Sequence, residues 1–278
     1  MNNDESTQWL VITDLDGTLL NHHSYAVDAA KSAIELLKAN HIPVVFNTSK
    51  TTTESITLQK ELNICAPFIV ENGSAIYIPK ILLDTPPEQA ESFDDFWMIT
   101  LGKHQQEIRG QLKQIATSKS SYQLLTDCTV EQTVNLTGLS EQQAQQALSR
   151  KFSEPLLWKS DATALTNFKQ QLAAHDLHTL QGGRFLHILG NTDKGKASNV
   201  LKSIYKTLNK SIKTIVLGDS ANDAAMLEIA DISIIVHSQS NHTLEQLITP
   251  NIKTENEAPL GWAEGIDKAL TKIEQNKE

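Results

Sequence analysis

Two carboxylates, Asp14 and Asp16, flank a single leucine directly after a short apolar segment. Carboxylates this close repel each other unless a cation lies between them or one of them is protonated. Such a pair can divide the work of phosphoryl transfer, with Asp14 attacking phosphorus and Asp16 exchanging a proton with the leaving and entering oxygens. An isolated motif of this kind has a structural alternative, because carboxylates are ordinary turn residues.

A second acidic cluster, Gly-Asp-Ser-Ala-Asn-Asp, occupies residues 218–223 after another apolar segment. Its carboxylates, Asp219 and Asp223, would add hard oxygen ligands beside Asp14, and such ligands suit Mg²⁺ better than zinc. Alone, this segment would be an aspartate helix cap after a glycine turn. Together the two clusters predict a magnesium site, because each of them follows a predicted strand of the same sheet.

Thr48 and Lys194 supply what an acidic metal site lacks. A phosphoryl group bound there needs a hydroxyl or amide donor and a fixed cation to balance the charge that develops during transfer. Thr48 follows an apolar segment, and Lys194 begins a predicted helix. Either residue alone would be ordinary, as a helix cap or as a surface lysine.

Strands and helices that alternate along the chain must position these residues. Buried strands are predicted at 9–13, 42–46, 67–70, 214–217 and 232–236, and helices at 26–40, 53–62, 194–208 and 221–229. This order predicts an α/β fold, with a Rossmann-like parallel sheet and helices on both of its faces. Open sheets of this class bind ligands at the carboxyl ends of their strands, which is where the four motifs lie.

Residues 84–185 follow a different pattern. Short strands are predicted at 96–100, 123–125, 156–159 and 178–181, and helices near 103–118, 140–151 and 162–174. We therefore predict an α+β domain at 84–185, inserted into a discontinuous core made of residues 1–83 and 186–278.

The four motifs, in this order, resemble those of the haloacid dehalogenase (HAD) superfamily of phosphatases, and the insertion has the size and position of its C2-type cap. The resemblance implies a Mg²⁺-dependent phosphomonoester hydrolase that works through an aspartyl-phosphate. The implied catalytic residues are Asp14 as nucleophile, Asp16 as general acid and base, Thr48 on the phosphoryl oxygens and Lys194 as the neutralising cation. The implied metal ligands are Asp14, the backbone carbonyl of Asp16, and Asp219, with Asp223 supporting the site.

A narrower resemblance concerns the substrate. Residues 47–51, 70–73, 138–140, 150–155, 182–187 and 261–262 resemble short motifs of mannosyl-3-phosphoglycerate phosphatases, which release mannosylglycerate and phosphate. Commoner sugar-phosphatase relatives have Thr-Gly-Arg where this chain has Thr-Ser-Lys at 48–50. The candidate substrate-binding residues are Ser49, Lys50, Glu71, Asn72, Gly73, Arg150, Arg184 and Asn222.

Each candidate substrate contact has a chemical reason. Arg150 and Arg184 can pair with a glycerate carboxylate in bidentate fashion, whereas Glu71 and Asn72 can hydrogen-bond hydroxyls. The alternative for each arginine is a solvated surface residue. We expect His187, which alternates with an apolar residue on a predicted strand, to be a buried structural histidine.

Composition excludes other classes of function. The 278 residues carry a net charge of −9, which argues against a general nucleic-acid binder and against a protein that binds anionic membranes. Two cysteines form neither a disulfide framework nor a zinc motif. The N-terminus is acidic, and no apolar run approaches the ~18 residues of a membrane span. We therefore expect a cytoplasmic protein whose partner is a small phosphorylated metabolite; the sequence carries no signal for an oligomeric state.

Scarce glycines also mark the predicted site. Of the 12 in the chain, six lie in its motifs, where the backbone turns sharply or approaches a ligand closely. These are Gly17, Gly73, Gly182, Gly183, Gly195 and Gly218.

Two other functions remain open at this point. The first is a HAD enzyme for another sugar phosphate or for glucosyl-3-phosphoglycerate, or a phosphomutase, because leaving-group selection lies in the insertion and not in the core motifs. The second is a non-enzymatic, receiver-like module that is phosphorylated on one aspartate. Receivers are single domains of about 120 residues, and a module that keeps its phosphate does not need Asp16.

Overall fold

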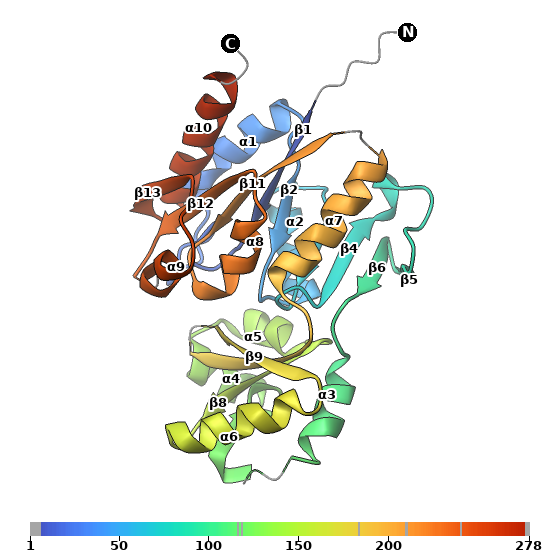
Figure 1. The fold of residues 1–278 in the computed structure, drawn as a ribbon, viewed down its shortest axis with the longest axis vertical. Helices are drawn as coiled ribbons and strands as arrows, with labels where there is room; N and C mark the ends of the chain where they lie inside the picture. The colour runs from blue at the N-terminus through green and yellow to red at the C-terminus, as the bar shows by residue number, and fades with distance from the viewer. Residues whose placement is uncertain are drawn as a thin grey trace.

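The structure is a computed structural model that describes residues 7–115, 117, 119–182, 184–208, 211–239 and 241–275. Gly183, one of the glycines singled out in the sequence, lies outside these residues. Figure 1 shows two parts, each built around its own sheet, with the chain crossing twice between them. Among the described residues, no helix is long and apolar enough to cross a membrane.

A nine-stranded sheet organises the larger part. Its strands are β1 (Gln8–Thr13), β2 (Val44–Asn47), β3 (Phe68–Val70), β4 (Ala75–Pro79), β5 (Glu91–Phe93), β6 (Phe96–Thr100), β11 (Ile212–Gly218), β12 (Ile232–His237) and β13 (Ile252–Glu257). They lie in the order β13-β12-β11-β1-β2-β3-β4-β6-β5. The six strands from β13 to β3 are parallel, and β4, β6 and β5 extend the sheet in antiparallel fashion.

Helices cover both faces of this sheet, as the sequence predicts. One face carries α1 (Lys31–Ala39), α2 (Thr52–Glu61) and α10 (Leu260–Gln275), and the other carries α7 (Lys194–Leu208), α8 (Ala224–Glu228) and α9 (Asn241–Leu247). Successive residues of β1 illustrate the two layers, because side chains alternate across a strand. Val11 packs with Ile34 and Trp262 on the first face, and Ile12 packs with Leu201 on the second. The predicted α/β fold class is confirmed.

A four-stranded antiparallel sheet organises the smaller part. Its strands are β7 (Tyr122–Leu124), β8 (Ser153–Trp158), β9 (Leu177–Gly182) and β10 (Phe185–Gly190), in the order β7-β8-β10-β9. Its helices are α3 (Gln105–Leu112), α4 (Val130–Thr137), α5 (Glu141–Leu148) and α6 (Ala162–Ala173). Ile108 of α3 and Phe168 of α6 pack against Leu156 and Ile188, so these two helices cover one face of the sheet. Figure 1 shows α6 on the side away from the larger part.

The sheet that each strand joins gives the insertion a different extent from the predicted one. Strand β6, predicted in the insertion that begins at 84, pairs with β4 and belongs to the nine-stranded sheet, whereas β10 beyond 185 belongs to the smaller one. The hydrophobic pattern of a short strand does not encode which sheet the strand joins. We propose that the inserted segment spans residues 103–190.

The two connections between the parts touch each other. A Cβ at Gly190 would lie 2.7 Å from the backbone nitrogen of Lys103, and one at Gly102 would lie 3.0 Å from the side chain of Ser74. Both crossings therefore leave the larger part at one narrow junction.

Candidate active site

Three buried carboxylates gather at the carboxyl ends of β1 and β11. Asp14 follows β1 and Asp219 follows β11, and these strands are parallel neighbours in which Thr13 lies opposite Leu217. With Asp223, the two offer ligand oxygens that all lie within 4.8 Å of one another. The predicted meeting of the two acidic motifs is what the structure shows.

Lys194 is the cation of this cluster. Its Nζ lies 2.6 Å from Oδ1 of Asp14 and 2.7 Å from Oδ1 of Asp223, and the side chain is fully buried. Burial alone would lower the pKa of Lys194, but the two carboxylates outweigh it and hold the pKa above its ordinary value. Lys194 therefore remains an ammonium.

The charge balance of the cluster fits a divalent cation. Burial raises the pKa of Asp14 well above its ordinary value; Lys194 opposes this rise, while Asp223 and Asp219 add to it. One ammonium faces three carboxylates, so the cluster keeps an excess of negative charge. An all-oxygen donor set with excess negative charge suits Mg²⁺.

Asp219 and Asp223 are oriented by their own loop and by the first motif. The hydroxyl of Thr18 donates to Oδ1 of Asp219 at 2.9 Å, and Oδ2 of Asp223 accepts from the backbone N–H groups of Asp219 and Ser220 at 3.0 Å each. Gly17 has a φ of +84°, and a Cβ there would lie 2.7 Å from Oδ2 of Asp219. The glycine of the first motif thus leaves room for a carboxylate of the last one.

Gly73 has a similar role at the start of α7. Its φ is +91°, and a Cβ there would lie 2.1 Å from the carbonyl oxygen of Asp193. The hydroxyl of Thr192 also donates to the carbonyl of Gly73, at 2.7 Å. The structure therefore shows Gly73 packed against the loop that positions Lys194, where the sequence predicted a contact with substrate.

Polar loops after β2, β3 and β11 are joined around the cluster. The backbone N–H of Asn72 donates to the carbonyl of Thr48 at 2.9 Å, and Nδ2 of Asn222 donates to Oδ1 of Asn72 at 3.2 Å. The hydroxyl of Thr48 accepts the N–H of Lys50 at 3.1 Å, which leaves its own proton to be donated. The structure thus brings together the predicted residues Thr48, Asn72 and Asn222.

Asp16 stands apart from the three carboxylates and is paired with Lys50. The Nζ of Lys50 lies 2.8 Å from Oδ1 of Asp16, 3.7 Å from Oε1 of Glu54 and 4.9 Å from the centre of the Tyr25 ring. Burial lowers the pKa of Lys50, but Asp16 and then Glu54 outweigh it, so the pKa lies above its ordinary value. Lys50 therefore holds the Asp16 carboxylate in place from the side of β2.

Glu71 joins the two parts of the molecule. Its buried carboxylate accepts hydrogen bonds from the backbone N–H of Lys151 at 2.9 Å, from that of Phe152 at 3.1 Å and from the hydroxyl of Ser153 at 2.6 Å. These contacts hold Glu71 against the inserted segment, and its role in binding substrate hydroxyls stays a prediction. A contact across about 80 residues of chain has no local sequence signal.

The two candidate arginines differ in position. Nη1 of Arg150 donates to the carbonyl of Ser49 at 3.0 Å and to the hydroxyl of Ser153 at 3.1 Å, and its side chain is only 7% exposed. Arg150 therefore lies between the two parts, and Ser49 contacts it through its backbone carbonyl. Arg184 is exposed and donates to the carbonyl of Leu136 within the inserted segment.

Helix α5 also rests on α2 of the larger part. Nε2 of Gln146 donates to the hydroxyl of Thr57 at 3.0 Å, and the carbonyl of Gln146 accepts from Thr51 at 3.0 Å. The hydroxyl of Ser149 lies 3.2 Å from that of Thr53. With Glu71 and Arg150, these contacts hold the inserted segment against the loops that carry the site.

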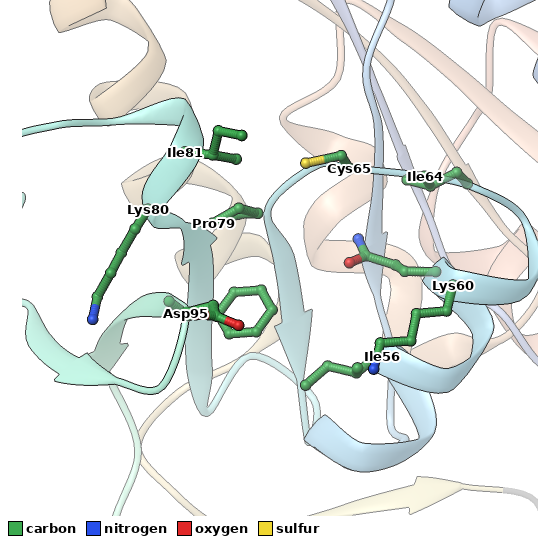
Figure 2. A pocket seen from close by; sticks show the side chains of 10 residues that line it. Ile56, Lys60, Ile64, Cys65, Pro79, Lys80, Ile81 and Asp95 are labelled. Atoms are coloured by element: carbon green, nitrogen blue, oxygen red, sulfur yellow. The ribbon is translucent and has the colours of Figure 1, made fainter.

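A separate pocket of about 400 Å³ lies between α2 and β4. Figure 2 shows its lining side chains, with Cys65 and Ile81 among them. Pro79 in this pocket ends β4, and β4 is antiparallel to β3, so the pocket lies at the opposite end of the sheet from the carboxylates. It is not the site described above.

Asn241 is a supporting residue that the sequence did not predict. Its Nδ2 donates to the carbonyl of Asp219 at 2.7 Å and to that of Val236 at 3.0 Å, which fixes the loop after β11. Thr18 had a signal, because it belongs to the first motif, whereas Asn241 has none within its own segment.

Comparison with known proteins identifies the class of this fold and site. A sequence model of the haloacid dehalogenase-like hydrolases matches residues 11–260, and the chain belongs to this family. It is 36% identical over 260 residues to a glucosyl-3-phosphoglycerate/mannosyl-3-phosphoglycerate phosphatase of Methanococcoides burtonii, covering 92% of this chain and 95% of that one. It is also 36% identical over 269 residues to the protein of the same name from Persephonella marina, covering 96% and 98%.

Solved structures share the fold at low sequence identity. One is a haloacid dehalogenase-like hydrolase from Bacteroides thetaiotaomicron, with a TM-score of 0.63 and 16% identity over 95% of this chain and 100% of that one. Another is the sucrose-phosphatase of Synechocystis in complex with sucrose and phosphate, with a TM-score of 0.62 and 15% identity over 97% and 99%.

Proposed function

We propose that this protein is a cytoplasmic, Mg²⁺-dependent phosphatase that hydrolyses mannosyl-3-phosphoglycerate, with glucosyl-3-phosphoglycerate as the second candidate substrate. The observation that carries the chemistry is the buried cluster of Asp14, Asp219 and Asp223 around Lys194. The choice of substrate is supported by the two relatives at 36% identity, whose names specify both compounds.

The reaction needs a nucleophile and a proton carrier. A carboxylate oxygen of Asp14 attacks phosphorus in line while Asp16 protonates the oxygen of the leaving alcohol, so the P–O bond breaks as the aspartyl-phosphate forms. A water then attacks the phosphorus of this intermediate and gives its proton to Asp16, which releases phosphate and restores Asp14. Because Asp16 lies outside the three-carboxylate cluster, it can exchange protons while the cluster binds the phosphoryl group.

Charge on the phosphoryl group is balanced by fixed residues. Lys194 already contacts Asp14 at 2.6 Å, so it lies beside the atom that receives the phosphoryl group. Thr48 donates its hydroxyl to a phosphoryl oxygen. Asp14, the backbone carbonyl of Asp16, and Asp219 would hold Mg²⁺, with Asp223 orienting the loop. The bound ion supplies Lewis-acid stabilisation of the phosphoryl oxygens.

The inserted segment selects the leaving group and shields the reaction from water. Arg150 and Arg184 of this segment are candidate cations for the glycerate carboxylate. Lys50, Ser49, Asn72 and Asn222 are candidate substrate contacts on the loops of the larger part. Arg150 is better placed than Arg184, because it lies buried between the two parts.

A substrate panel tests this function. Phosphate release is measured with Mg²⁺ for mannosyl-3-phosphoglycerate, glucosyl-3-phosphoglycerate, sucrose 6-phosphate and hexose phosphates. We expect the highest kcat/KM for one of the two glycosyl phosphoglycerates. A hexose phosphate that is hydrolysed far better than both would overturn the substrate and leave the phosphatase chemistry standing. A phosphoenzyme that is stable for hours would instead favour a receiver-like module.

A further inference from the structure

His187 faces the active-site loops from the sheet of the inserted segment. On β10, Leu186 and Ile188 pack into the cluster beneath α3 and α6, so His187 between them points to the opposite face. In the register with β8, Leu189 lies opposite Ser153, which places Ser153 on the same face as His187. Ser153 bonds to Glu71 of the larger part, so this face is the one turned toward the site.

Gly182 makes room for the imidazole. It pairs with Phe185 on the neighbouring strand, and a Cβ there would lie 2.9 Å from Nε2 and 3.0 Å from Cδ2 of His187. The Gly-x-x-x-x-His spacing of residues 182–187 is therefore a unit in which the glycine lets the ring lie against β9. Any larger residue at 182 would push the ring away.

The imidazole is buried, with 5% of His187 exposed, and its Nδ1 has no hydrogen-bond partner among the described residues. Arg150, which is 7% exposed, has an Nε in the same condition within the described part of the chain. Buried polar atoms normally have partners, so two such atoms where the inserted segment meets the site indicate a ligand.

His187 binds this ligand as an uncharged group. Burial lowers its pKa to about 3, and the positive charges of Arg150 and Lys194 act in the same direction. A neutral imidazole has one donor and one acceptor nitrogen and no charge, and a hydroxyl, which can both donate and accept, suits it better than an anion does. The guanidinium of Arg150 supplies the charge that an anion needs.

We propose that His187 is a specificity-determining residue whose Nδ1 hydrogen-bonds a hydroxyl of the glycosyl unit in the leaving group. This inference rests on the proposed function. It differs from the structural role that the sequence predicts for this histidine, and it assigns the 182–187 motif to recognition of an uncharged, hydroxyl-bearing group.

Two variants at this position test the proposal. His187→Leu removes the hydrogen bond, and His187→Asn keeps a polar atom near the place of Nδ1; His175→Leu removes a histidine elsewhere in the inserted segment as a control. Phosphate release is measured with mannosyl-3-phosphoglycerate and with p-nitrophenyl phosphate, which has no hydroxyl. We expect His187→Leu to raise KM for the glycosyl substrate about 10- to 100-fold, with p-nitrophenyl phosphate within twofold of wild type. His187→Asn should lose less than His187→Leu, and the His175→Leu control should keep the wild-type KM for both substrates.

Several results would overturn the proposal. Equal loss with both substrates in His187→Leu, without recovery in His187→Asn, would show a structural role. An unchanged KM in both variants would show that His187 does not bind a hydroxyl of the substrate. A crystal structure with bound mannosylglycerate in which Nδ1 contacts only an ordered water would show the same. If wild type prefers another hydroxyl-bearing phosphomonoester, the proposed substrate fails. The same comparison with the preferred compound then still decides the role of His187.

Discussion

Glu71→Gln tests whether the inserted segment must be held against the core for activity. The carboxylate accepts three hydrogen bonds from residues 151–153, two on Oε2 and one on Oε1. A glutamine has a single accepting oxygen, so at least one buried backbone N–H loses its acceptor and the remaining bonds lose their ionic character. Hydrogen bonds to charged groups contribute about 1.5–3 kcal/mol each. We therefore expect Glu71→Gln to weaken the docking of the inserted segment by about 2–4 kcal/mol in total.

Two measurements report the free energy that Glu71→Gln removes from the docking of the inserted segment. A loss of about 2–4 kcal/mol shifts the docking of the inserted segment by roughly 30- to 700-fold, since about 1.4 kcal/mol corresponds to a factor of ten. We expect urea unfolding to begin at lower denaturant and KM for mannosyl-3-phosphoglycerate to rise at least about tenfold. Glu107→Gln is the matched control, because Glu107 is exposed and accepts its bond from His104 at the start of α3. An E71Q protein with the unfolding curve and KM of wild type would show that these hydrogen bonds do not hold the inserted segment in its active position.

Three further predictions concern charge and backbone. Glu154 is buried, and burial is the main cause that raises its pKa from 4.5 to about 7. The folded state therefore binds the proton of Glu154 more tightly than the unfolded state does. The resulting contribution to the free energy of unfolding is full below pH 4.5 and is lost as pH rises through 7. Glu154→Gln should flatten this fall, which reaches about 3 kcal/mol, in urea titrations at pH 5 and pH 8. Gly73→Ala should lower the melting temperature, because Gly73 has a φ of +91° and a Cβ there would meet the carbonyl of Asp193. It should also lower the activity, because the loop that positions Lys194 must move. An unchanged melting temperature would contradict this prediction. Lys194→Met should lower kcat by about 100-fold or more without changing the fold seen by circular dichroism, and retained kcat would contradict its role beside Asp14.

Three of the four site motifs were predictable because each of them follows a strand of the parallel sheet. Asp14 and Asp219 end apolar segments that read as buried parallel strands, and open sheets of this class place such ends together. The sequence pattern therefore predicted the acidic cluster and the residues around it. Lys194 was predicted as the first residue of a strongly patterned helix. The expectation that it follows a strand of the parallel sheet was wrong, because β10 before it belongs to the smaller sheet.

Contacts between the two parts were not predictable. Glu71 meets residues 151–153 only because the inserted segment docks on the loops of the core, and no local pattern records that docking. The hairpin of β5 and β6 was assigned to the insertion for a related reason, since a short apolar strand can pair with either sheet. The sequence around Arg150 and Arg184 does not show which side chain is buried. The fold shows that Arg150 is buried and that Arg184 is exposed.

The central claim is that Asp14 is the nucleophile of a Mg²⁺-dependent phosphatase. The most direct measurement is phosphate release from mannosyl-3-phosphoglycerate by wild type and by Asp14→Asn, each with Mg²⁺ and with excess chelator. We expect rapid release by wild type with Mg²⁺ and background release in the other three cases. Full activity of Asp14→Asn, or of wild type in excess chelator, would contradict it.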